Sequence, residues 1–419
     1  MSLIAYKRIN GIRGSVTPPA DKSITHRAFI LAAMAHGRSK IHNPLLSLDT
    51  QATLAALQAV GVEVTFENRS VIINSNGFAR FRSPQKDIDC GNSGTTARLL
   101  MGLLAPAGIT ARLDGDESLR KRPMARVIEP LRAMGADISG EKLPIKISPA
   151  LMHSADIVGK VASAQVKSAI LLAGMQLPDV TSYTEPLLTR NHTERMMPMF
   201  GVEIRKEGNT SYVGGGKIEP CELTVPGDIS SAAMLIAAAY IYGNSEITVR
   251  QVGLNPTRTA FIDILKSWGA DIARDSALCG DIIVKSSALS GGEISGSMSA
   301  YAIDELPLLA ALGLFTDNGV VIKDAAELRH KECDRISAMV HNLRLLGAEV
   351  EEFDDGLAVS PLKDGKSGVL FDSMGDHRIA MINIMLAKRW EGGINSDDLA
   401  ALKVSFPTFI NELERLEIK

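Results

Sequence analysis

One phrase of apolar and polar positions recurs along the chain. An amphipathic helix pattern ends in glycine and is followed by a small or branched residue, an acidic residue and a β-branched residue. Glycine can take the left-handed conformation that ends a helix, so the phrase predicts a helix followed by a strand. The five copies are LAALQAVGVEV (54–64), EPLRAMGADI (129–138), MMPMFGVEI (196–204), DILKSWGADI (263–272) and HNLRLLGAEV (341–350). Their spacing of about 70 residues divides the chain into six repeats.

Each repeat also contains an earlier and more apolar helix pattern. Apolar residues surround most of these helices, which is typical of a buried helix. The six patterns are SITHRAFILAAMAHG, GTTARLLMGLLAPAG, SAQVKSAILLAGM, SSAAMLIAAAYIYG, DELPLLAALGLF and DHRIAMINIMLA. We therefore expect each repeat to run strand, buried helix, strand, outer helix and a pair of strands.

The two ends of the chain predict how the repeats are grouped. The sixth repeat has no strand pattern after VSFPTFINELERLEIK, whereas a spare strand pattern, AYKRINGIRGSVTPP, lies near the N-terminus. We expect this N-terminal strand to complete the last repeat, with the chain crossing between two halves near 18–20 and 224–227. The fold class is then mixed α/β (α+β), with two similar domains of three βαβαββ repeats and buried parallel helices. The predicted domains are 19–224 and 1–18 plus 225–419.

Composition narrows the functional class. The 419 residues are 45% hydrophobic and 22% charged, as in ordinary globular proteins. The net charge of −3 gives no general attraction to nucleic acid or an anionic membrane. The longest apolar run, Ala232–Tyr242, is shorter than the ~18–20 residues that span a bilayer. With no signal-peptide pattern and four cysteines that lack CxxC spacing, we expect a cytoplasmic protein in a reducing compartment.

Polar residues gather where the buried helices begin. Free backbone N–H groups and the helix dipole favour anions at such ends. If the three helices of a domain run in the same direction, these ends meet at one cleft. The cations there are Lys22, Arg27, Arg98, Lys167 and Arg378, joined from the second helices by Arg122, Arg190, Lys331 and Arg335. On a helix, Ser23 and Arg27 are four residues apart, as are Lys331 and Arg335, so each pair could grip one anionic group.

Each of these features alone has an ordinary explanation. GNSGTT lacks the Lys-Ser/Thr of a P-loop, and such a segment is often only a helix cap. Asp304 could be a simple N-terminal acid, and Lys331-Glu332 and Asp334-Arg335 could be salt bridges on an exposed helix. The histidines lack metal-ligand spacing, so no metal is expected. Their occurrence at equivalent places of six repeats favours a shared anion site instead.

The motifs in combination resemble the 5-enolpyruvylshikimate-3-phosphate synthase family. They are ADKSITHR, DCGNSGTTAR, SLRKRPM, SAQVKSA, TRNHTERM, PGDISSA, IDELP, LRHKECDR and GDHR, and they cover the whole chain. The resemblance implies an inside-out α/β barrel fold with the active site in the cleft between two domains. It implies transfer of the enolpyruvyl group of phosphoenolpyruvate to the 5-hydroxyl of shikimate 3-phosphate, with release of phosphate, in chorismate and aromatic amino acid biosynthesis. It implies a monomer with no metal or organic cofactor and no nucleic-acid or membrane partner.

The resemblance also implies roles for individual residues. Those implied in catalysis are Lys22, Asp304 and Glu332. Those implied in phosphoenolpyruvate binding are Lys22, Gly94, Arg122, Gln165, Arg335 and Arg378. Those implied in shikimate 3-phosphate binding are Lys22, Ser23, Arg27, Ser163, Ala164, Gln165, Arg190, Asp304 and Lys331.

Two positions depart from the family pattern, and two alternatives stay open. Val404 takes the place of a lysine that often precedes Ser/Thr-Phe-Pro, with Lys403 one residue earlier, and Glu327 takes the place of an asparagine. One alternative is the sister enolpyruvyl transferase that acts on UDP-N-acetylglucosamine, which places Asn after its active-site Lys, whereas this chain has Lys22-Ser23. The other is a non-catalytic repeat protein that binds anions or nucleic acid, although aromatic residues make up only 5% of the chain.

Overall fold

The computed structural model describes residues 3–396 and 398–418, which fold into two compact units. Unit 2 is the continuous stretch Ala20–Val225, and unit 1 combines the residues up to Pro19 with those from Pro226 onward. Each unit has its own hydrophobic core. The chain therefore passes from one unit to the other after Pro19 and again after Val225.

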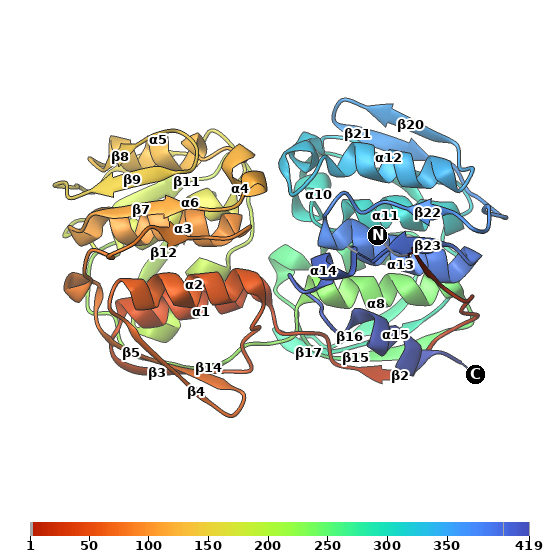
Figure 1. The fold of residues 1–419 in the computed structure, drawn as a ribbon, viewed down its shortest axis with the longest axis horizontal. Coiled ribbons are helices and arrows are strands. Elements are labelled where there is room, and N and C mark those ends of the chain that lie inside the picture. Colours follow the sequence, from red (N-terminus) through yellow and green to blue (C-terminus); the bar gives the residue numbers. More distant parts are fainter. Residues whose placement is uncertain (1–2, 397, 419) are drawn as a thin grey trace. The chain divides into compact units, whose positions relative to one another are not determined.

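Three buried helices form the centre of unit 2, with strands outside them (Figure 1). These are α1 (Lys22–Met34), α3 (Gly94–Leu104) and α6 (Ala164–Gly174). The other helices are α2 (Leu48–Ala59), α4 (Glu117–Lys121), α5 (Ala125–Ala133) and α7 (His192–Met196). The strands are β3 (His36–His42), β4 (Glu63–Glu67), β5 (Ser70–Asn76), β6 (Ile88–Asp89), β7 (Ala111–Asp114), β8 (Asp137–Ser139), β9 (Ile145–Ser148), β10 (Asp156–Val158), β11 (Thr181–Thr184), β12 (Ile204–Glu207), β13 (Thr210–Val213) and β14 (Glu222–Thr224). They pair in the orders β14-β3-β5-β4, β6-β7-β9-β8 and β10-β11-β13-β12.

A glycine allows two of these helices to pack closely. A Cβ on Gly102 of α3 would lie 2.1 Å from the backbone oxygen of Ala169 in α6, a distance that no side chain could occupy. The two helix backbones can approach this closely only because Gly102 has no side chain. The close packing brings the N-terminal ends of α3 and α6 within reach of each other's side chains, as described below.

Unit 1 repeats the same plan. Its central helices α8 (Ile229–Tyr242), α11 (Leu306–Leu312) and α13 (His377–Trp390) pack against one another. The other helices are α9 (Ala260–Ser267), α10 (Gly296–Tyr301), α12 (Arg335–Leu345), α14 (Asp398–Leu402) and α15 (Phe409–Leu416). The strands are β1 (Leu3–Ala5), β2 (Arg13–Val16), β15 (Glu246–Gly253), β16 (Asp271–Arg274), β17 (Cys279–Lys285), β18 (Gly292–Ile294), β19 (Val320–Ile322), β20 (Val350–Phe353), β21 (Gly356–Val359), β22 (Leu370–Phe371) and β23 (Gly393–Asn395). They pair in the orders β16-β17-β15-β2, β18-β19-β21-β20 and β1-β23-β22.

The recurring helix-to-strand phrase has the predicted backbone. The glycine in each of its five copies has a positive φ, between 72° and 99°, which an L side chain rarely adopts. They are Gly61, Gly135, Gly201, Gly269 and Gly347. The six buried helices are also confirmed, and α8 is buried along its whole length, as its continuous apolar sequence predicts.

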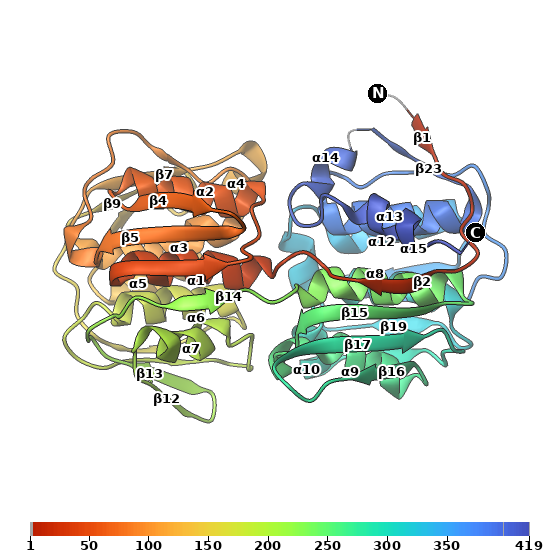
Figure 2. The ribbon, with the colours of Figure 1, turned by 90° about the horizontal axis from the view of Figure 1, so that it is seen from below.

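The N-terminal segment differs in part from the prediction. Strand β1 does pair with β23 and so joins the sheet of the sixth repeat. Strand β2, however, pairs in parallel with β15 and completes the sheet of the fourth repeat (Figure 2). The repeat pattern explains this difference, because β14 completes the first sheet of unit 2 in the same way by pairing in parallel with β3. The strand that precedes the first helix of each unit thus belongs to the other unit.

Candidate active site

The N-terminal ends of α3 and α6 are joined by side chains of unit 2. Arg98 Nη1 donates to Gln165 Oε1 at 2.6 Å, and Gln165 Nε2 donates to Thr95 Oγ1 at 2.9 Å. Arg98 Nη2 also donates to the backbone oxygen of Pro123 at 3.1 Å. The sequence marked Arg98 as a cation at a helix end but indicated no individual role for it. The structure makes it the partner that orients Gln165.

Gly94 leaves room for two guanidinium groups at the N-terminus of α3. A Cβ at this position would lie 3.0 Å from Arg98 Nη1 and 3.4 Å from Arg122 Nη1. Arg122 follows α4 and is buried, and its Nη2 donates to Asn92 Oδ1 in the turn before α3. The two cations and the N–H groups at the start of α3 together make this corner suited to a small anion.

Lys22, the first residue of α1, is held by a carboxylate from α2. Its Nζ lies 3.0 Å from Asp49 Oδ2. Beneath this pair, His26 Nδ1 lies 2.7 Å from Thr53 Oγ1, which lies 2.8 Å from Thr96 Oγ1. This buried chain of polar groups connects α1, α2 and α3, so Lys22 begins a helix that is tied to its neighbours.

Arg27 is held by the protein on three sides. Its Nε donates to Thr193 Oγ1 at 2.7 Å, its Nη2 to Ser168 Oγ at 2.9 Å and its Nη1 to the backbone oxygen of Ser23 at 3.0 Å. Burial lowers the pKa of Arg27 to about 10, and the charge of Glu194 opposes that shift. Arg27 therefore carries its charge at neutral pH and connects α1 with α6 and α7.

A buried ion cluster lies beneath the start of α6. Lys167 Nζ is 2.7 Å from Glu185 Oε2 and 2.6 Å from Glu194 Oε1, and the lysine side chain is 0% exposed. Glu185 Oε1 also accepts a hydrogen bond from Thr189 N at 3.0 Å. Arg190 follows in the segment between β11 and α7 and is partly exposed.

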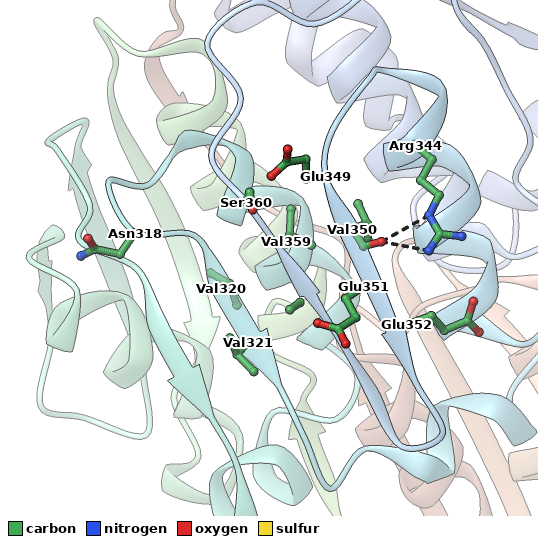
Figure 3. A pocket seen from close by; sticks show the side chains of 11 residues that line it. Asn318, Val320, Val321, Arg344, Glu349, Val350, Glu351, Glu352, Val359 and Ser360 are labelled. Carbon is green, nitrogen blue, oxygen red and sulfur yellow. Dashed lines mark hydrogen bonds between the residues drawn. The ribbon is translucent and has the colours of Figure 1, made fainter.

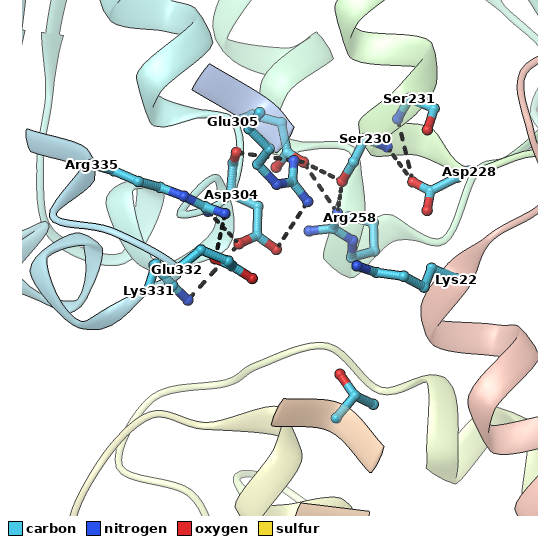
Figure 4. Close-up of polar contacts among 12 residues, drawn as sticks. Lys22, Asp228, Ser230, Ser231, Arg258, Asp304, Glu305, Lys331, Glu332 and Arg335 are labelled. Atoms are coloured by element: carbon cyan, nitrogen blue, oxygen red, sulfur yellow. Dashed lines mark hydrogen bonds and ion pairs between the residues drawn. The ribbon is translucent and has the colours of Figure 1, made fainter. Parts of the chain in front are cut away.

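In unit 1, three cations surround the carboxylate of Asp304. Its oxygens lie 3.6 Å from Arg335 Nη1, 3.7 Å from Arg378 Nη2 and 3.9 Å from Lys331 Nζ. Asp304 lies in the turn just before α11, and Figure 4 shows its carboxylate facing Arg335 and Lys331. Glu332 lies beside it and pairs with Arg335 at 2.7 Å.

The most deeply buried of these cations, Arg335, also forms an ion pair with a buried carboxylate. Arg335 Nε donates to Asp376 Oδ2 at 2.7 Å, and Asp376 also caps α13 by accepting from Arg378 N at 2.8 Å. Although burial opposes it, the charges of Asp376 and Glu332 raise the pKa of Arg335. Burial alone would raise the pKa of Asp376, but the positive charge of Arg335 outweighs burial, so the pKa is lowered. Both groups are therefore charged at neutral pH.

A second buried pair lies next to Asp304. Arg258 Nη2 donates to Ser230 Oγ at 2.6 Å and lies 3.2 Å from Glu305 Oε1, which also accepts from Ser230 Oγ at 2.5 Å. Glu305 Oε1 is 3.6 Å from Arg378 Nη1, so the pair connects α8 to the group around Asp304 (Figure 4). Arg258 and Glu305 are not among the residues that the sequence predicted for the site. The acid next to Asp304 in IDELP was the available signal for Glu305, whereas nothing in the sequence around Arg258 indicated its place.

One predicted geometry is wrong. Ser23 and Arg27 both lie on α1, as expected. Lys331 and Arg335 do not share a helix, because α12 begins only at Arg335 and Lys331 follows a short 3₁₀ helix, Ala326–His330. They approach the same anion, Asp304, from different elements instead.

The structure places the remaining residues singled out by the sequence on several different elements. Ser163 caps α6, accepting from Val166 N at 3.4 Å, and Ala164 is the first residue of that helix. Lys403 and Val404 lie between α14 and α15, and Glu327 lies in the 3₁₀ helix before Lys331. Among residues 3–396 and 398–418, no three His, Cys, Asp or Glu side chains are grouped so that they could hold a metal ion.

A pocket of about 610 Å³ lies elsewhere in unit 1, on the sheet of β19, β20 and β21 (Figure 3). It contains none of the predicted site residues. The acidic side chains that line it are Glu349, Glu351 and Glu352. The cation that lines it, Arg344, donates to the backbone oxygen of Val350 at 2.9 Å. Its charge is therefore unsuited to an anionic substrate. In the part of the chain that the structure describes, no helix has both the length and the apolar character needed to cross a membrane.

The sequence matches a known protein family along almost its whole length. The family described as EPSP synthase (3-phosphoshikimate 1-carboxyvinyltransferase) matches residues 6–413. The chain is 41% identical to the 3-phosphoshikimate 1-carboxyvinyltransferase of Bacillus licheniformis, covering 98% of this chain and 99% of that one. It is 43% identical to the protein of the same name from Geobacillus kaustophilus, over 97% and 98% of the two chains.

Solved structures agree with these sequence matches. EPSP synthase from Acinetobacter baumannii superposes with a TM-score of 0.86 at 36% identity, covering 100% of this chain and 98% of that one. The enolpyruvyl transferase NikO from Streptomyces tendae shares the fold, with a TM-score of 0.80 at 16% identity over 99% and 97% of the chains. The chain therefore belongs to the EPSP synthase (3-phosphoshikimate 1-carboxyvinyltransferase) family of transferases.

Proposed function

We propose that this chain transfers the enolpyruvyl group of phosphoenolpyruvate to the 5-hydroxyl of shikimate 3-phosphate. The observation that carries the proposal is the group around Asp304, where one carboxylate lies within 3.6–3.9 Å of three cations with Glu332 beside it. Such a group can bind an anionic substrate and exchange protons with it. Membership of the EPSP synthase family supplies the identity of the substrates.

The reaction is an addition followed by an elimination. The 5-hydroxyl oxygen adds to C2 of phosphoenolpyruvate and loses its proton to a carboxylate, while C3 gains a proton. Phosphate then leaves C2 as a proton is removed from C3, which yields the enol ether and inorganic phosphate. Asp304 is the proposed base for the hydroxyl, and Glu332 and Lys22 share the proton transfers at C3. These steps need an acid and a base held close together.

The proposed binding residues divide between the units. Shikimate 3-phosphate is assigned chiefly to unit 2, with its phosphate at the start of α6 and beside Arg190. Phosphoenolpyruvate is assigned to cations of both units. Both units are therefore proposed to contribute residues to substrate binding. The residues assigned to shikimate 3-phosphate are Lys22, Ser23, Arg27, Ser163, Ala164, Gln165, Arg190, Asp304 and Lys331, and those assigned to phosphoenolpyruvate are Lys22, Gly94, Arg122, Gln165, Arg335 and Arg378.

The cations of unit 1 would stabilise the departing phosphate. Arg335 and Arg378 are charged donors positioned beside the proposed base, and fixed donors of this kind favour the transition state in which negative charge grows on the leaving group. Before substrate binds, Asp304 partly neutralises these cations. An incoming anion therefore competes with Asp304 for them, and this competition would release the carboxylate toward the hydroxyl.

A steady-state assay of phosphate release tests the proposal. Turnover is expected with shikimate 3-phosphate and phosphoenolpyruvate together and with neither alone. Turnover with phosphoenolpyruvate and UDP-N-acetylglucosamine, but not with shikimate 3-phosphate, would overturn it in favour of the sister transferase. The family comparisons support the first substrate pair. A monomeric state, a cytoplasmic location and the absence of nucleic-acid and membrane partners stay predictions.

A further inference from the structure

We propose that Lys167 is a positioning residue for shikimate 3-phosphate: it holds Glu185 and Glu194 so that the segment between them presents Arg190 to the substrate phosphate. The inference rests on the proposed function and adds a residue that it does not include. Lys167 itself would not touch the substrate, because its side chain is 0% exposed and its ammonium group is occupied by two carboxylates.

The position of Lys167 is unfavourable for a cation unless it has partners. It is the fourth residue of α6, near the positive end of the helix dipole, and the helix around it is buried from Val166 to Gly174. Burying an ammonium group removes its hydration, which costs several kcal/mol. Its two partners, Glu185 at 2.7 Å and Glu194 at 2.6 Å, compensate this cost. The lysine is therefore tied to two points of the chain at once.

Those two points enclose the segment that carries Arg190. Glu185 follows β11, and Glu194 lies on α7, while residues 185–191 form no helix or strand. Glu185 uses its second oxygen to accept from Thr189 N at 3.0 Å and also from the Thr189 hydroxyl. The residue directly before Arg190 is thus bound to the same carboxylate that Lys167 holds. Without regular structure of its own, the segment depends on these contacts for its conformation.

The same cluster extends to Arg27. Ser168, the residue after Lys167, accepts from Arg27 at 2.9 Å and lies 2.7 Å from Thr193 Oγ1, and Thr193 precedes Glu194. Glu194 also acts on Arg27 through its charge. Two cations, Lys167 and Arg27, therefore balance two carboxylates. The cluster therefore connects Arg27 with the segment that carries Arg190.

A purely structural role would not require these charges. Replacing a buried ion cluster by apolar residues of similar volume is often neutral or stabilising, so stability alone gives no reason for a lysine here. The ion pairs of Lys167 with Glu185 and Glu194 do, however, hold the irregular segment 185–191 in one conformation. A misplaced Arg190 would lose its contact with the phosphate, and charge-assisted contacts of that kind depend strongly on geometry.

The test is Lys167→Met, which removes the ammonium and keeps the length of the side chain. Calorimetric titration of the full-length protein with shikimate 3-phosphate alone should show an affinity at least tenfold lower than that of the unchanged protein. The KM for shikimate 3-phosphate should rise by a similar factor, while the KM for phosphoenolpyruvate changes less than threefold. A folded Lys167→Met protein that binds shikimate 3-phosphate with unchanged affinity would overturn the proposal.

Two further variants separate positioning from stability. Lys388 is a matched control, since it is a buried lysine of α13 whose Nζ lies 3.1 Å from Glu414 Oε1 and no substrate role is assigned to it. Lys388→Met should lower the thermal stability but leave the shikimate 3-phosphate affinity unchanged. Lys167→Arg keeps a charged donor and should recover part of the affinity that Lys167→Met loses. Equal losses of affinity in Lys388→Met and Lys167→Met would count against positioning.

If Lys167→Met does not fold, the double variant Lys167→Met, Glu185→Gln decides, because it removes one cation together with one carboxylate and leaves Glu194 to balance Arg27. The same loss of affinity is expected from it. Unchanged affinity for shikimate 3-phosphate would overturn the proposal. Failure of this charge-balanced variant to fold would assign the cluster a structural role and would also overturn it. Phosphate release by the unchanged protein tests the proposed function separately, so an inactive unchanged protein and an unaffected variant are distinct failures.

Discussion

The two units begin their buried helices with different chemistry. In unit 2, α3 and α6 are capped by the hydroxyl groups of Ser93 and Ser163. In unit 1, carboxylates occupy the corresponding places: Asp228 caps α8, Glu305 is the N-cap residue of α11 and Asp376 caps α13. The third buried helix of unit 2, α1, begins with a carboxylate cap, Asp21, which Lys22 follows. Two units of the same repeat plan therefore begin most of their buried helices with different groups, neutral hydroxyls in unit 2 and carboxylates in unit 1.

This difference indicates that the helix ends of the two units are suited to different tasks. A neutral serine cap leaves the positive end of the helix available to a ligand anion, whereas a carboxylate cap already neutralises it. Unit 2 is thus suited to binding phosphate at its helix ends. Unit 1 keeps its cations beside its own carboxylates, as around Asp304, and is suited to moving protons. The predictions below test this division, from the largest expected effect to the smallest.

The largest effect should come from removing the proposed base of unit 1. Asp304→Asn keeps the shape of the side chain but cannot accept the hydroxyl proton, so kcat should fall by about 100- to 10,000-fold. Binding of phosphoenolpyruvate, measured by calorimetry, should be largely retained. Glu349→Gln, an acidic residue of the pocket in the same unit, is the control and should leave kcat within twofold. A near-normal rate for Asp304→Asn would remove it from the catalytic residues.

The next effect concerns the stability of unit 1. Arg335→Met leaves the buried carboxylate of Asp376 without the guanidinium that lies 2.7 Å away, so the free energy of unfolding should fall by about 3–5 kcal/mol. Asp376→Asn keeps a side-chain oxygen to cap α13, so the double variant should recover much of the loss. Urea denaturation followed by circular dichroism measures both. If the double variant is no more stable than Arg335→Met, the uncompensated charge is not the cause.

The repeat plan could be predicted from local pattern. The five glycines with positive φ and the six buried helices follow from periodicity and from the conformational freedom of glycine, which are properties of neighbouring residues. The place of β2 was not predictable in the same way. The segment reads as a strand, but its pairing with β15 is a contact between residues more than 200 positions apart, which no local pattern specifies.

The ion pairs show the same limit. Sequence could mark Lys167, Arg335 and Lys22 as cations at helix ends, but it could not name their partners. Those partners come from other elements: Glu185 follows a strand, Asp376 caps the buried helix α13, and Asp49 lies on α2. The incorrect placement of Lys331 on the helix of Arg335 had a local cause, since α12 begins only after its Asp334 cap.

A smaller effect should follow from giving unit 2 the cap chemistry of unit 1. Ser163→Asp can still accept from Val166 N, so α6 should be as stable as before or more so. The added negative charge at the helix end should repel the substrate phosphate and weaken shikimate 3-phosphate binding by about tenfold, or ~1.4 kcal/mol. Thr408→Asp, at the start of the peripheral helix α15, is the control and should not change this affinity. Unchanged affinity for Ser163→Asp would break the comparison between the units.

The smallest effect concerns how the two units respond to acid. Burial lowers the pKa of His26 from 6.5 to about 3, with Lys22 and Arg27 adding to the shift and Asp49 opposing it. His26 is therefore neutral in the folded protein, whereas in the unfolded chain it takes up a proton below about pH 6.5. The free energy of unfolding should consequently be nearly unaffected by His26 above pH 7 and fall as the pH drops below it, by about 0.7 kcal/mol between pH 7 and pH 6. In unit 1, the lowered pKa of Asp376 keeps the pair with Arg335 charged through this range, so its contribution should be constant there.

Denaturation of the unchanged protein and of His26→Gln at pH 7 and pH 6 measures the difference. The loss between the two pH values should be about 0.7 kcal/mol smaller in His26→Gln. The same substitution at the exposed His36 should leave the loss unchanged. An equal loss in the unchanged protein and His26→Gln would show that the acid sensitivity arises outside this histidine.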